Sequence, residues 1–173
     1  MKRILMFMMA VLLVAGGARA DEVVVTMHLV SPSGIGKEIG NITAKDTQYG
    51  TVFFPNLSEL PPGLHGFHVH QNPDCGPGEV QGKMVAGLAA GGHYDPMDSG
   101  YHAGPYGDGH LGDLPALYVD AEGKSTHPLL APRIKVGDLR NRSLMIHAGA
   151  DNYADQPAKL GGGGARIACG VVK

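Results

Sequence analysis

The clearest candidates for chemistry are histidines that alternate along one strand-like segment. His68 and His70 stand two residues apart in the run GFHVH, residues 66–70. In an extended strand such residues project from one face about 7 Å apart, so both imidazoles can reach a single metal ion. His147 ends another apolar segment, residues 143–147, and can supply a third nitrogen from a neighbouring strand. A lone strand histidine is more often structural, but a His-x-His pair with further histidines in adjoining loops favours a metal site.

A second group of ligand-type residues lies in a glycine-rich segment. His102, His110 and Asp113 have spacings of eight and three residues. Imidazoles together with one carboxylate suit a tetrahedral Zn²⁺ ion. His93 lies between the two groups in the sequence, and an imidazolate can bind a metal through each of its ring nitrogens. The spacing therefore permits His93 to join two metal ions, although spacing alone does not show that it does.

Three further histidines are expected to lie outside these groups. His65 precedes His68 by three residues, and we expect it to have a structural hydrogen-bonding role. His28 and His127 occupy strand positions that alternate with apolar residues, so we expect both to lie on the surface.

The elements that must position these side chains are short strands. Residues 22–30 are rich in β-branched side chains and alternate with a period of two, which is typical of a strand. Seven further segments have a similar composition and are separated by turns: 39–44, 50–54, 64–70, 116–120, 126–130, 143–148 and 166–172. Eight short strands without a sustained 3.6-residue period predict an all-β sandwich or barrel. A helical turn is expected near residues 136–140.

Two long segments do not fit the strand pattern. Residues 72–113 and 150–165 are rich in glycine and poor in β-branched residues. Long loops in a compact domain are usually functional or disordered. Because these two segments hold or border most of the histidines, we expect them to be functional loops.

Length and composition exclude several classes of protein. The chain has 173 residues, which suits one domain. A formal net charge of −2 excludes a strongly basic nucleic-acid binder. The longest apolar run, residues 4–15, is shorter than the roughly 20 residues that a membrane-spanning helix needs, so no integral membrane segment is expected.

The first twenty residues have the three parts of a secretory signal peptide. Lys2 and Arg3 precede the apolar run, and Ala18-x-Ala20 provides small residues at a cleavage position. Removal of this segment would leave residues 21–173, with 11 basic and 16 acidic residues and a net charge of −5. We therefore expect an exported, mildly acidic protein.

The two cysteines are interpreted in the light of export. Cys75 and Cys169 are 94 residues apart, and an even number of cysteines in an oxidising compartment favours a disulfide. The alternative is a pair of unpaired, buried thiols.

Taken together, six longer motifs resemble the secreted bacterial branch of the copper/zinc superoxide dismutase family. They span nearly the whole chain after the signal peptide: GFHVH (66–70), GGHYDP (91–96), YHAGP (101–105), GHLGDLP (109–115), SLMIHAGADN (143–152) and GGGGARIACGVV (161–172). The resemblance implies an eight-stranded antiparallel Greek-key sandwich or barrel with two long functional loops. It also implies a periplasmic oxidoreductase that acts on superoxide anion and carries one copper ion and one zinc ion.

The resemblance implies a role for each residue that matches the motifs. The implied copper ligands are His68, His70, His93 and His147. The implied zinc ligands are His93, His102, His110 and Asp113. His93 would thus be the shared ligand and would also carry a proton during the reaction.

Four other residues take their roles from the resemblance as well. Cys75 and Cys169 match the intrasubunit disulfide of the family. Asp151 matches a carboxylate that links the two metal sites through their histidines. Arg166 matches the cation that guides the anionic substrate toward copper, and a local cation is needed because the net charge of −5 repels that substrate.

Two departures from the eukaryotic relatives affect the assembly. The stretch from Cys75 to His93 is longer, and the loop from His147 to Arg166 is shorter and carries few charges. A homodimer, if formed, is therefore expected to use an interface unlike the eukaryotic one. Lys83 and Lys159 are weaker candidates for guiding the substrate.

Two other functions compete with dismutation on the sequence alone. One is an exported copper or zinc carrier or buffer without turnover. Carriers of Cu⁺ tend to use thiolate and thioether ligands, whereas here the methionines cluster in the signal peptide. The other is a domain of the same fold that has lost its metals, against which the complete set of ligands argues.

Overall fold

The computed structural model describes residues 21–173, so the predicted signal peptide at 1–20 lies outside the described residues. The strands are β1 (Glu22–Ser31), β2 (Gly34–Thr47), β3 (Gly50–Leu57), β4 (Gly63–His65), β5 (Phe67–His70), β6 (Gly78–Val80), β7 (Lys83–Val85), β8 (Leu117–Val119), β9 (Leu129–Ala131), β10 (Arg142–His147) and β11 (Arg166–Val172). The helical segments are η1 (Leu88–Ala90), α1 (Val136–Leu139) and η2 (Leu160–Gly162). None of the helices in the described part of the chain has the length and apolar character needed to cross a membrane.

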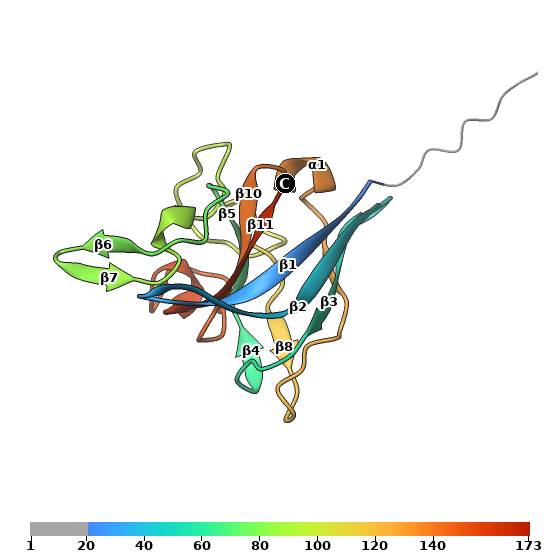
Figure 1. Ribbon diagram of the computed structural model, residues 1–173. Helices are drawn as coiled ribbons and strands as arrows, with labels where there is room; N and C mark the ends of the chain where they lie inside the picture. Colours follow the sequence, from blue (N-terminus) through green and yellow to red (C-terminus); the bar gives the residue numbers. More distant parts are fainter. Residues whose placement is uncertain (1–20) are drawn as a thin grey trace, which may run out of the picture.

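Seven of the strands form one antiparallel sheet. Its order is β5-β10-β11-β1-β2-β3-β9, and the sheet is strongly curled (Figure 1). Two smaller antiparallel pairs, β4–β8 and β6–β7, lie beside it. The predicted all-β antiparallel fold is confirmed, and the expected helical turn is present as α1.

The strand predicted over residues 64–70 is divided into β4 and β5 at Gly66. The Gly66 amide donates to the carbonyl of Gly149, and its carbonyl accepts from the amide of His147. A Cβ added at Gly66 would lie 3.1 Å from a ring carbon of His68. The chain therefore leaves the small β4–β8 pair at this glycine and enters the main sheet as β5.

The first long segment contains a hairpin that the sequence did not predict. Strands β6 and β7 pair antiparallel and project from the body of the molecule (Figure 1). The two turn residues, Gln81 and Gly82, both have positive φ angles, of 52° and 77°. Such a two-residue turn usually begins with Asn, Asp or Gly, so glutamine at the first position gave no hairpin signal.

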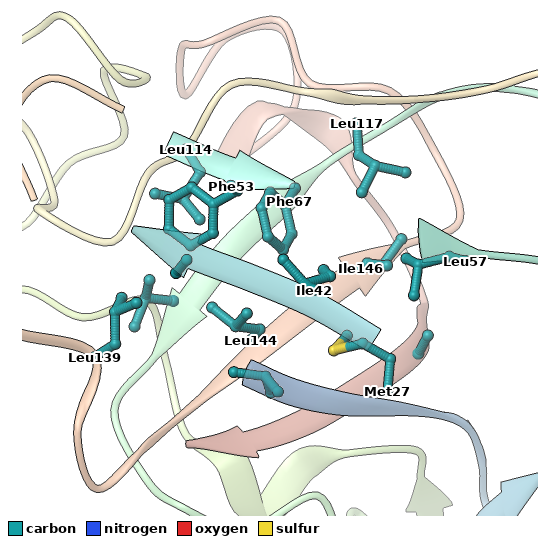
Figure 2. Packing of buried hydrophobic residues seen from close by; sticks show 14 of the residues in the cluster. Met27, Ile42, Phe53, Leu57, Phe67, Leu114, Leu117, Leu139, Leu144 and Ile146 are labelled. Atoms are coloured by element: carbon teal, nitrogen blue, oxygen red, sulfur yellow. The ribbon is translucent and has the colours of Figure 1, made fainter. Parts of the chain in front are cut away.

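The main core lies inside the curl of the sheet. Phe53 of β3 and Phe67 of β5 are fully buried and meet edge to face, with ring centroids 5.5 Å apart (Figure 2). Leu144 and Ile146 of β10 pack in the same cluster. Since side chains alternate along a strand, burial of Phe67 and Val69 in the core directs His68 and His70 to the opposite face. The core thus determines where the histidines of β5 project.

Candidate metal centre

Four histidines form the first cluster, which we call the four-histidine group: His68, His70, His93 and His147. One ring nitrogen of each lies within 4.8 Å of the others, and all four residues are buried. His68 and His70 are on β5, and His147 ends β10. His93 is placed by an isolated antiparallel bridge with His70. The sequence prediction that these four residues converge is thus consistent with the geometry.

Hydrogen bonds determine which ring nitrogen of each strand histidine is free. Nδ1 of His70 donates to the carbonyl of Gly91 at 2.9 Å, and Nδ1 of His147 donates to that of Gly164 at 3.1 Å. A carbonyl only accepts, so the proton is on Nδ1 and the lone pair is on Nε2. His68 is reversed, because its Nε2 lies 2.7 Å from a carboxylate oxygen of Asp151. Its free nitrogen is therefore Nδ1.

The free nitrogens of the four-histidine group have no hydrogen-bond partner. They are Nδ1 of His68 and the Nε2 atoms of His70, His93 and His147, and all are buried. Buried polar atoms are almost always paired, and four unpaired lone pairs facing one another are costly. A single metal ion pairs all of them, and an all-imidazole set suits copper. The residues present therefore fit a copper ion.

The second cluster, which we call the aspartate group, consists of His93, His102, His110 and Asp113. Nδ1 of His93 lies 2.8 Å from Oδ1 of Asp113, and Nδ1 of His102 lies 2.9 Å from Oδ2. Nδ1 of His110 is 3.4 Å from Oδ1. The Nδ1 atoms of His102 and His110 are buried without an aligned hydrogen bond. Three nitrogens converging on one carboxylate fit a tetrahedral Zn²⁺ ion.

Of the three histidines in the aspartate group, His110 lies farthest from the carboxylate of Asp113. The ligand atoms that lie within 4.8 Å of one another belong to His68, His93, His102 and Asp113, and His110 is outside that set. Nε2 of His68 is already occupied by Asp151, and its only free nitrogen belongs to the four-histidine group. His110, with its unpartnered Nδ1, is therefore the better fourth member.

His93 faces both groups. Its Nε2 is unpartnered beside the four-histidine group, and its Nδ1 is directed at Asp113. The His93 ring stacks on that of His68 with centroids 4.0 Å apart. One ring nitrogen is thus directed to each group, as a shared ligand requires.

Asp151 connects the two groups through a second pair of rings. Its Oδ2 lies 2.7 Å from Nε2 of His68 and its Oδ1 lies 2.8 Å from Nε2 of His102. The close approach of the neighbouring backbone requires glycine, because a Cβ at Gly161 would lie 1.9 Å from Oδ1 of Asp151. Gly161 also has a φ angle of +73°, which glycine adopts without strain.

The pKa values show which groups are charged without metal. Burial lowers the pKa of His68 to about 3 and that of His147 to about 4, and it lowers the pKa of His70 well below its ordinary value. Burial also lowers the pKa of His93. The four-histidine group is therefore neutral at pH 7, which is the state that binds metal.

The carboxylates have the opposite effect in the aspartate group. Burial opposes charge on His102, but the carboxylates of Asp113 and Asp151 on either side of its ring raise its pKa to about 9. Burial would raise the pKa values of both carboxyls, but hydrogen bonds from the histidines keep them below the ordinary range. Without metal, a proton on His102 thus balances part of the negative charge.

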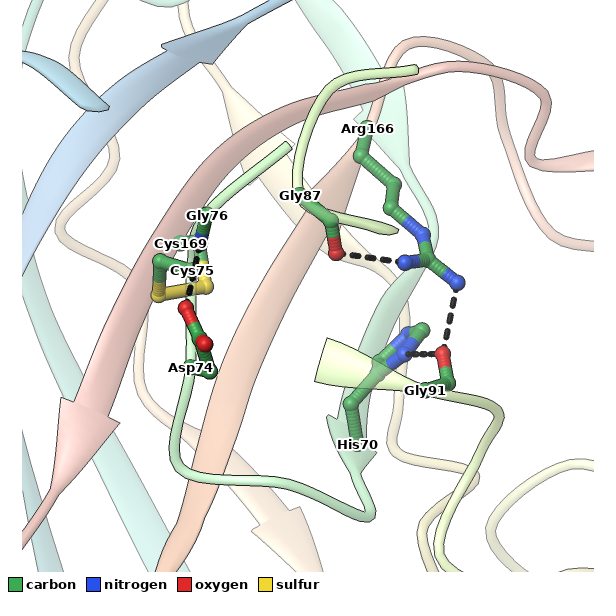
Figure 3. The surroundings of a disulfide bond; sticks show 8 residues. All are labelled: His70, Asp74, Cys75, Gly76, Gly87, Gly91, Arg166 and Cys169. Atoms are coloured by element: carbon green, nitrogen blue, oxygen red, sulfur yellow. Dashed lines mark hydrogen bonds between the residues drawn. A yellow bond between two sulfur atoms is a disulfide. The ribbon is translucent and has the colours of Figure 1, made fainter. Parts of the chain in front are cut away.

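Arg166 lies beside the four-histidine group in a fixed position. Its guanidinium donates to the carbonyls of Gly87 and Gly91, and the Gly91 carbonyl also accepts from His70 (Figure 3). The positive charge of Arg166 contributes to the lowered pKa values of His70 and His147. The predicted position of this cation close to the histidines is thus consistent with the structure.

The disulfide anchors the segment that provides those two carbonyls. Cys75 and Cys169 are bonded, with Cα atoms 5.7 Å apart, so the predicted pairing is confirmed and the alternative of free thiols is wrong (Figure 3). Cys169 is on β11, three residues after Arg166. The bond therefore fixes the loop that precedes Gly87 to the strand that carries the arginine.

The remaining histidines lie outside both groups. His65 is buried, and its ring nitrogens lie 2.7 Å from the carbonyl oxygens of His147 and Pro61, in agreement with a structural role. His127 is exposed and contacts Tyr118, and His28 is half-buried on β1.

Sequence reasoning missed two residues that hold the aspartate group. The carboxylate of Asp155 accepts from the amides of His102 and Leu160, each at 2.9 Å. Arg133 donates to the carbonyls of Gly109 and His110. Both act through backbone groups, and the only available signal was that Asp155 is one of few charges in its loop.

Comparisons with known proteins agree with this geometry. Residues 38–172 match the family model described as "Copper/zinc superoxide dismutase (SODC)". The chain is 51% identical over 162 residues to a protein of Brucella abortus named "Superoxide dismutase [Cu-Zn]". This match covers 93% of this chain and 94% of the relative.

Two solved structures have the same fold. The copper/zinc enzyme of Brucella abortus has a TM-score of 0.87 and 51% identity, and the match covers 88% of this chain and 100% of that one. The solution structure of the monomeric copper, zinc enzyme of Salmonella enterica has a TM-score of 0.80 and 50% identity, with the same coverage.

Proposed function

Starting from the finding that the chain belongs to the copper/zinc superoxide dismutase family, we propose that its two buried groups are the metal sites of that enzyme. The protein is an oxidoreductase that converts two superoxide anions and two protons into one dioxygen and one hydrogen peroxide. The proposed copper ligands are His68, His70, His93 and His147. The proposed zinc ligands are His93, His102, His110 and Asp113.

The observation that supports this assignment is the set of unpartnered ring nitrogens. Six of them are buried, four in the four-histidine group and the Nδ1 atoms of His102 and His110 in the aspartate group. In each case the other ring nitrogen of a strand histidine is already held by a carbonyl or by Asp151. Such outer partners fix the tautomer and orient the ring for a metal.

The chain contributes orientation, charge and a proton-carrying atom. When bound, copper supplies one-electron redox chemistry and zinc supplies a fixed positive charge. Nε2 of His93 is the atom proposed to hold and release a proton, while Asp113 keeps the opposite side of the ring in place. Arg166 places a permanent positive charge beside His70, where it attracts an anionic substrate.

Reconstitution of metal-free protein tests the assignment. With copper and zinc added together, we expect rapid decay of superoxide. The variant His93→Gln should lose most of this dismutase activity. His127→Gln is the matched control, because His127 is exposed and outside both groups. A carrier would bind the metals without turnover, and a domain without metal sites would do neither.

The location and the extent of the domain are further proposals. We propose that residues 1–20 are a signal peptide, that 21–173 form a single domain, and that this domain works in the periplasm. The disulfide supports an oxidising compartment. Fractionation of a bacterial culture, with N-terminal sequencing of the exported protein, should give Asp21 as the first residue.

The assembly also stays a prediction. A homodimer through an interface unlike the eukaryotic one is proposed, whereas the relative of Salmonella enterica is described as monomeric. Leu64 and Tyr118 face each other across β4 and β8 and are 55% and 44% exposed, so this pair offers apolar surface for a contact. Sedimentation equilibrium of the protein and of Tyr118→Ser distinguishes the two states.

A further inference from the structure

The members of the aspartate group are not held equally well. His93 is fixed by its bridge with His70, and Asp113 by a bridge with His68. His102 has Asp155 on its backbone amide and Asp151 on its ring. His110 lies in an irregular loop and outside the set of mutually close ligand atoms, and its backbone amide donates to Tyr101 at 3.1 Å. The position of His110 therefore depends on what fixes the carbonyl side of its backbone.

Arg133 provides the side-chain contact on that side, next to the amide of Asp113, which donates to the carbonyl of His110 at 3.4 Å. One guanidinium nitrogen donates to the carbonyl of Gly109 at 2.7 Å, and the other approaches the carbonyl of His110 at 3.4 Å. The side chain is half-buried. The planar fork of a guanidinium can hold two neighbouring carbonyls at once, which restricts rotation of the peptide between them.

The backbone of Arg133 is anchored through its neighbours. It lies between β9 and α1, next to the buried Ile134. The hydroxyl of Thr51 donates to the carbonyl of Ile134 at 2.8 Å, and Thr51 also pairs with Ala131 of β9. Arg133 therefore reaches the loop from a fixed point at the edge of the main sheet.

We propose that Arg133 is a positioning residue for the zinc site, which holds the backbone of Gly109 and His110 so that Nδ1 of His110 is directed at Asp113. This inference rests on the proposed assignment of His110 as a zinc ligand. Charge and positioning predict opposite effects on zinc binding, because a cation close to a metal site repels Zn²⁺. If charge were the only effect of Arg133, its removal would tighten zinc binding, whereas loss of positioning weakens it.

The test compares zinc affinity in three variants of the full exported protein. Arg133→Met keeps the length of the side chain without its donors, and Arg133→Lys keeps the charge with a single donor group. Arg140→Met is the matched control, because Arg140 is an exposed arginine at the end of α1. Zinc affinity is measured by competition with a chelator on metal-free protein. Cobalt(II) placed in the zinc site is followed by its visible absorption, which reports the coordination geometry.

We expect Arg133→Met to bind zinc about 10–100-fold more weakly, the usual effect of losing an outer-shell partner. Arg133→Lys should lie between Arg133→Met and the parent, since one ammonium does not hold both carbonyls in a fixed plane. The cobalt spectrum of Arg133→Met should change in shape or intensity. Copper affinity in the four-histidine group and the properties of Arg140→Met should match the parent. If Arg133→Met does not fold, Arg133→Lys alone decides the question by the same two measurements.

Two outcomes would overturn the proposal. In one, the Arg133 variants bind zinc as tightly as the parent, or more tightly, with an unchanged cobalt spectrum. In the other, zinc and copper affinities fall equally, which indicates a general structural role. His110→Ala separates this result from failure of the zinc assignment. If His110→Ala leaves zinc affinity unchanged, the assignment of the site is wrong, and if it weakens zinc binding while Arg133→Met does not, only the role of Arg133 is wrong.

Discussion

At the scale of single residues, the chemistry depends on which nitrogen of each ring carries the proton. His70 and His147 are fixed by backbone carbonyls, whereas His68 and His102 are both fixed by Asp151. A carboxylate can accept from two rings at once. The side chain of Asp151 therefore sets the tautomers of one ring in each proposed metal site.

Replacing Asp151 by asparagine should disturb both sites unequally. The amide of Tyr153 donates to Oδ1 at 2.8 Å, so the oxygen of asparagine should keep that position and still accept from His102. The amide nitrogen would then face His68 and move the proton of that ring to Nδ1, the nitrogen proposed to bind copper. We expect Asp151→Asn to weaken copper binding about 10–100-fold, measured by chelator competition, and zinc binding less. Asp98→Asn is the control, since Asp98 is an exposed residue of the same long loop as His102. Equal copper affinity in Asp151→Asn and Asp98→Asn would contradict the role of the bridge.

Arg166 should govern the rate through its charge. The predicted exported chain has a net charge of −5, which opposes an anionic substrate, and steering effects in clefts are about 10–1000-fold. We expect Arg166→Ala to slow superoxide decay at low salt about tenfold and to flatten its dependence on ionic strength, because screening acts on the charge that was removed. Arg166→Lys keeps the charge and should retain most of that dependence. Equal rates and equal salt slopes for Arg166→Ala and the parent would reject the idea.

The proposed ligand residues could be singled out from the sequence because their chemistry is in their side chains. The motifs placed His93 between two groups, and the structure brings it to both. Arg133 could not be predicted in this way, because its partners are the carbonyls of Gly109 and His110. Every residue has a carbonyl, so the sequence contains no signal for which one is used.

At the scale of elements, the period-two pattern predicted β11 at its observed bounds and β1 to within one residue. The pattern failed where chain direction changes without a change in composition. Gly66 divides one predicted strand into β4 and β5 because its backbone pairs with the loop after β10. The β6–β7 hairpin was missed because its turn begins with Gln81 rather than a usual turn residue.

The disulfide should contribute strongly to stability because it closes a long loop. It joins β11 to the segment before the β6–β7 hairpin across 94 residues. We expect the double variant Cys75→Ser/Cys169→Ser to lose about 4 kcal/mol of unfolding free energy, since cross-linking restricts the unfolded chain. For a domain of this size that loss lowers the Tm by about 8–16 °C.

Urea and thermal unfolding of the oxidised parent and of the double variant measure the effect. The parent treated with a reductant is the matched control, because it has the same broken bond without any substitution. The loop also holds the Gly87 and Gly91 carbonyls, so the variant should show a weaker salt dependence of rate as Arg166 becomes less fixed. An unchanged Tm would contradict the expected contribution.

At the scale of the whole molecule, folding brings together groups that water would keep apart. Seven ligand-type residues from β5, β10 and the loop between η1 and β8 are all buried. Packing of Phe67 and Val69 in the core directs the neighbouring histidines into this cluster. Folding without metal therefore buries nitrogen atoms that have no partner, which lowers the free energy of unfolding. Bound metal ions would pair these nitrogens, so the metal-free protein should be far less stable than the loaded one.

That cost should be visible as a pH dependence of the metal-free protein. In the unfolded chain a histidine has a pKa of about 6.5, whereas burial lowers the pKa of His68 to about 3 and that of His147 to about 4. Between pH 6.5 and pH 4 the unfolded state therefore binds more protons than the folded state, and stability falls as the pH falls. Each such group contributes up to about 1.4 kcal/mol per pH unit, and His70 acts in the same direction.

His102 has the opposite sign and a different window. Its pKa is raised to about 9, so the stabilisation from its proton is fully present below pH 6.5 and is lost as the pH rises toward 9.

The metal-free protein should thus be most stable near pH 6.5–7 and lose stability on both sides, more steeply on the acid side because several histidines act there. Urea unfolding at pH 5, 6, 7 and 9 measures this curve, with His127→Gln as a control that leaves its shape unchanged. With copper and zinc bound, the same nitrogens are occupied by metal, so the acid-side loss should shift to lower pH. A metal-free protein equally stable at pH 5 and pH 7 would show that these histidines are not buried as neutral rings.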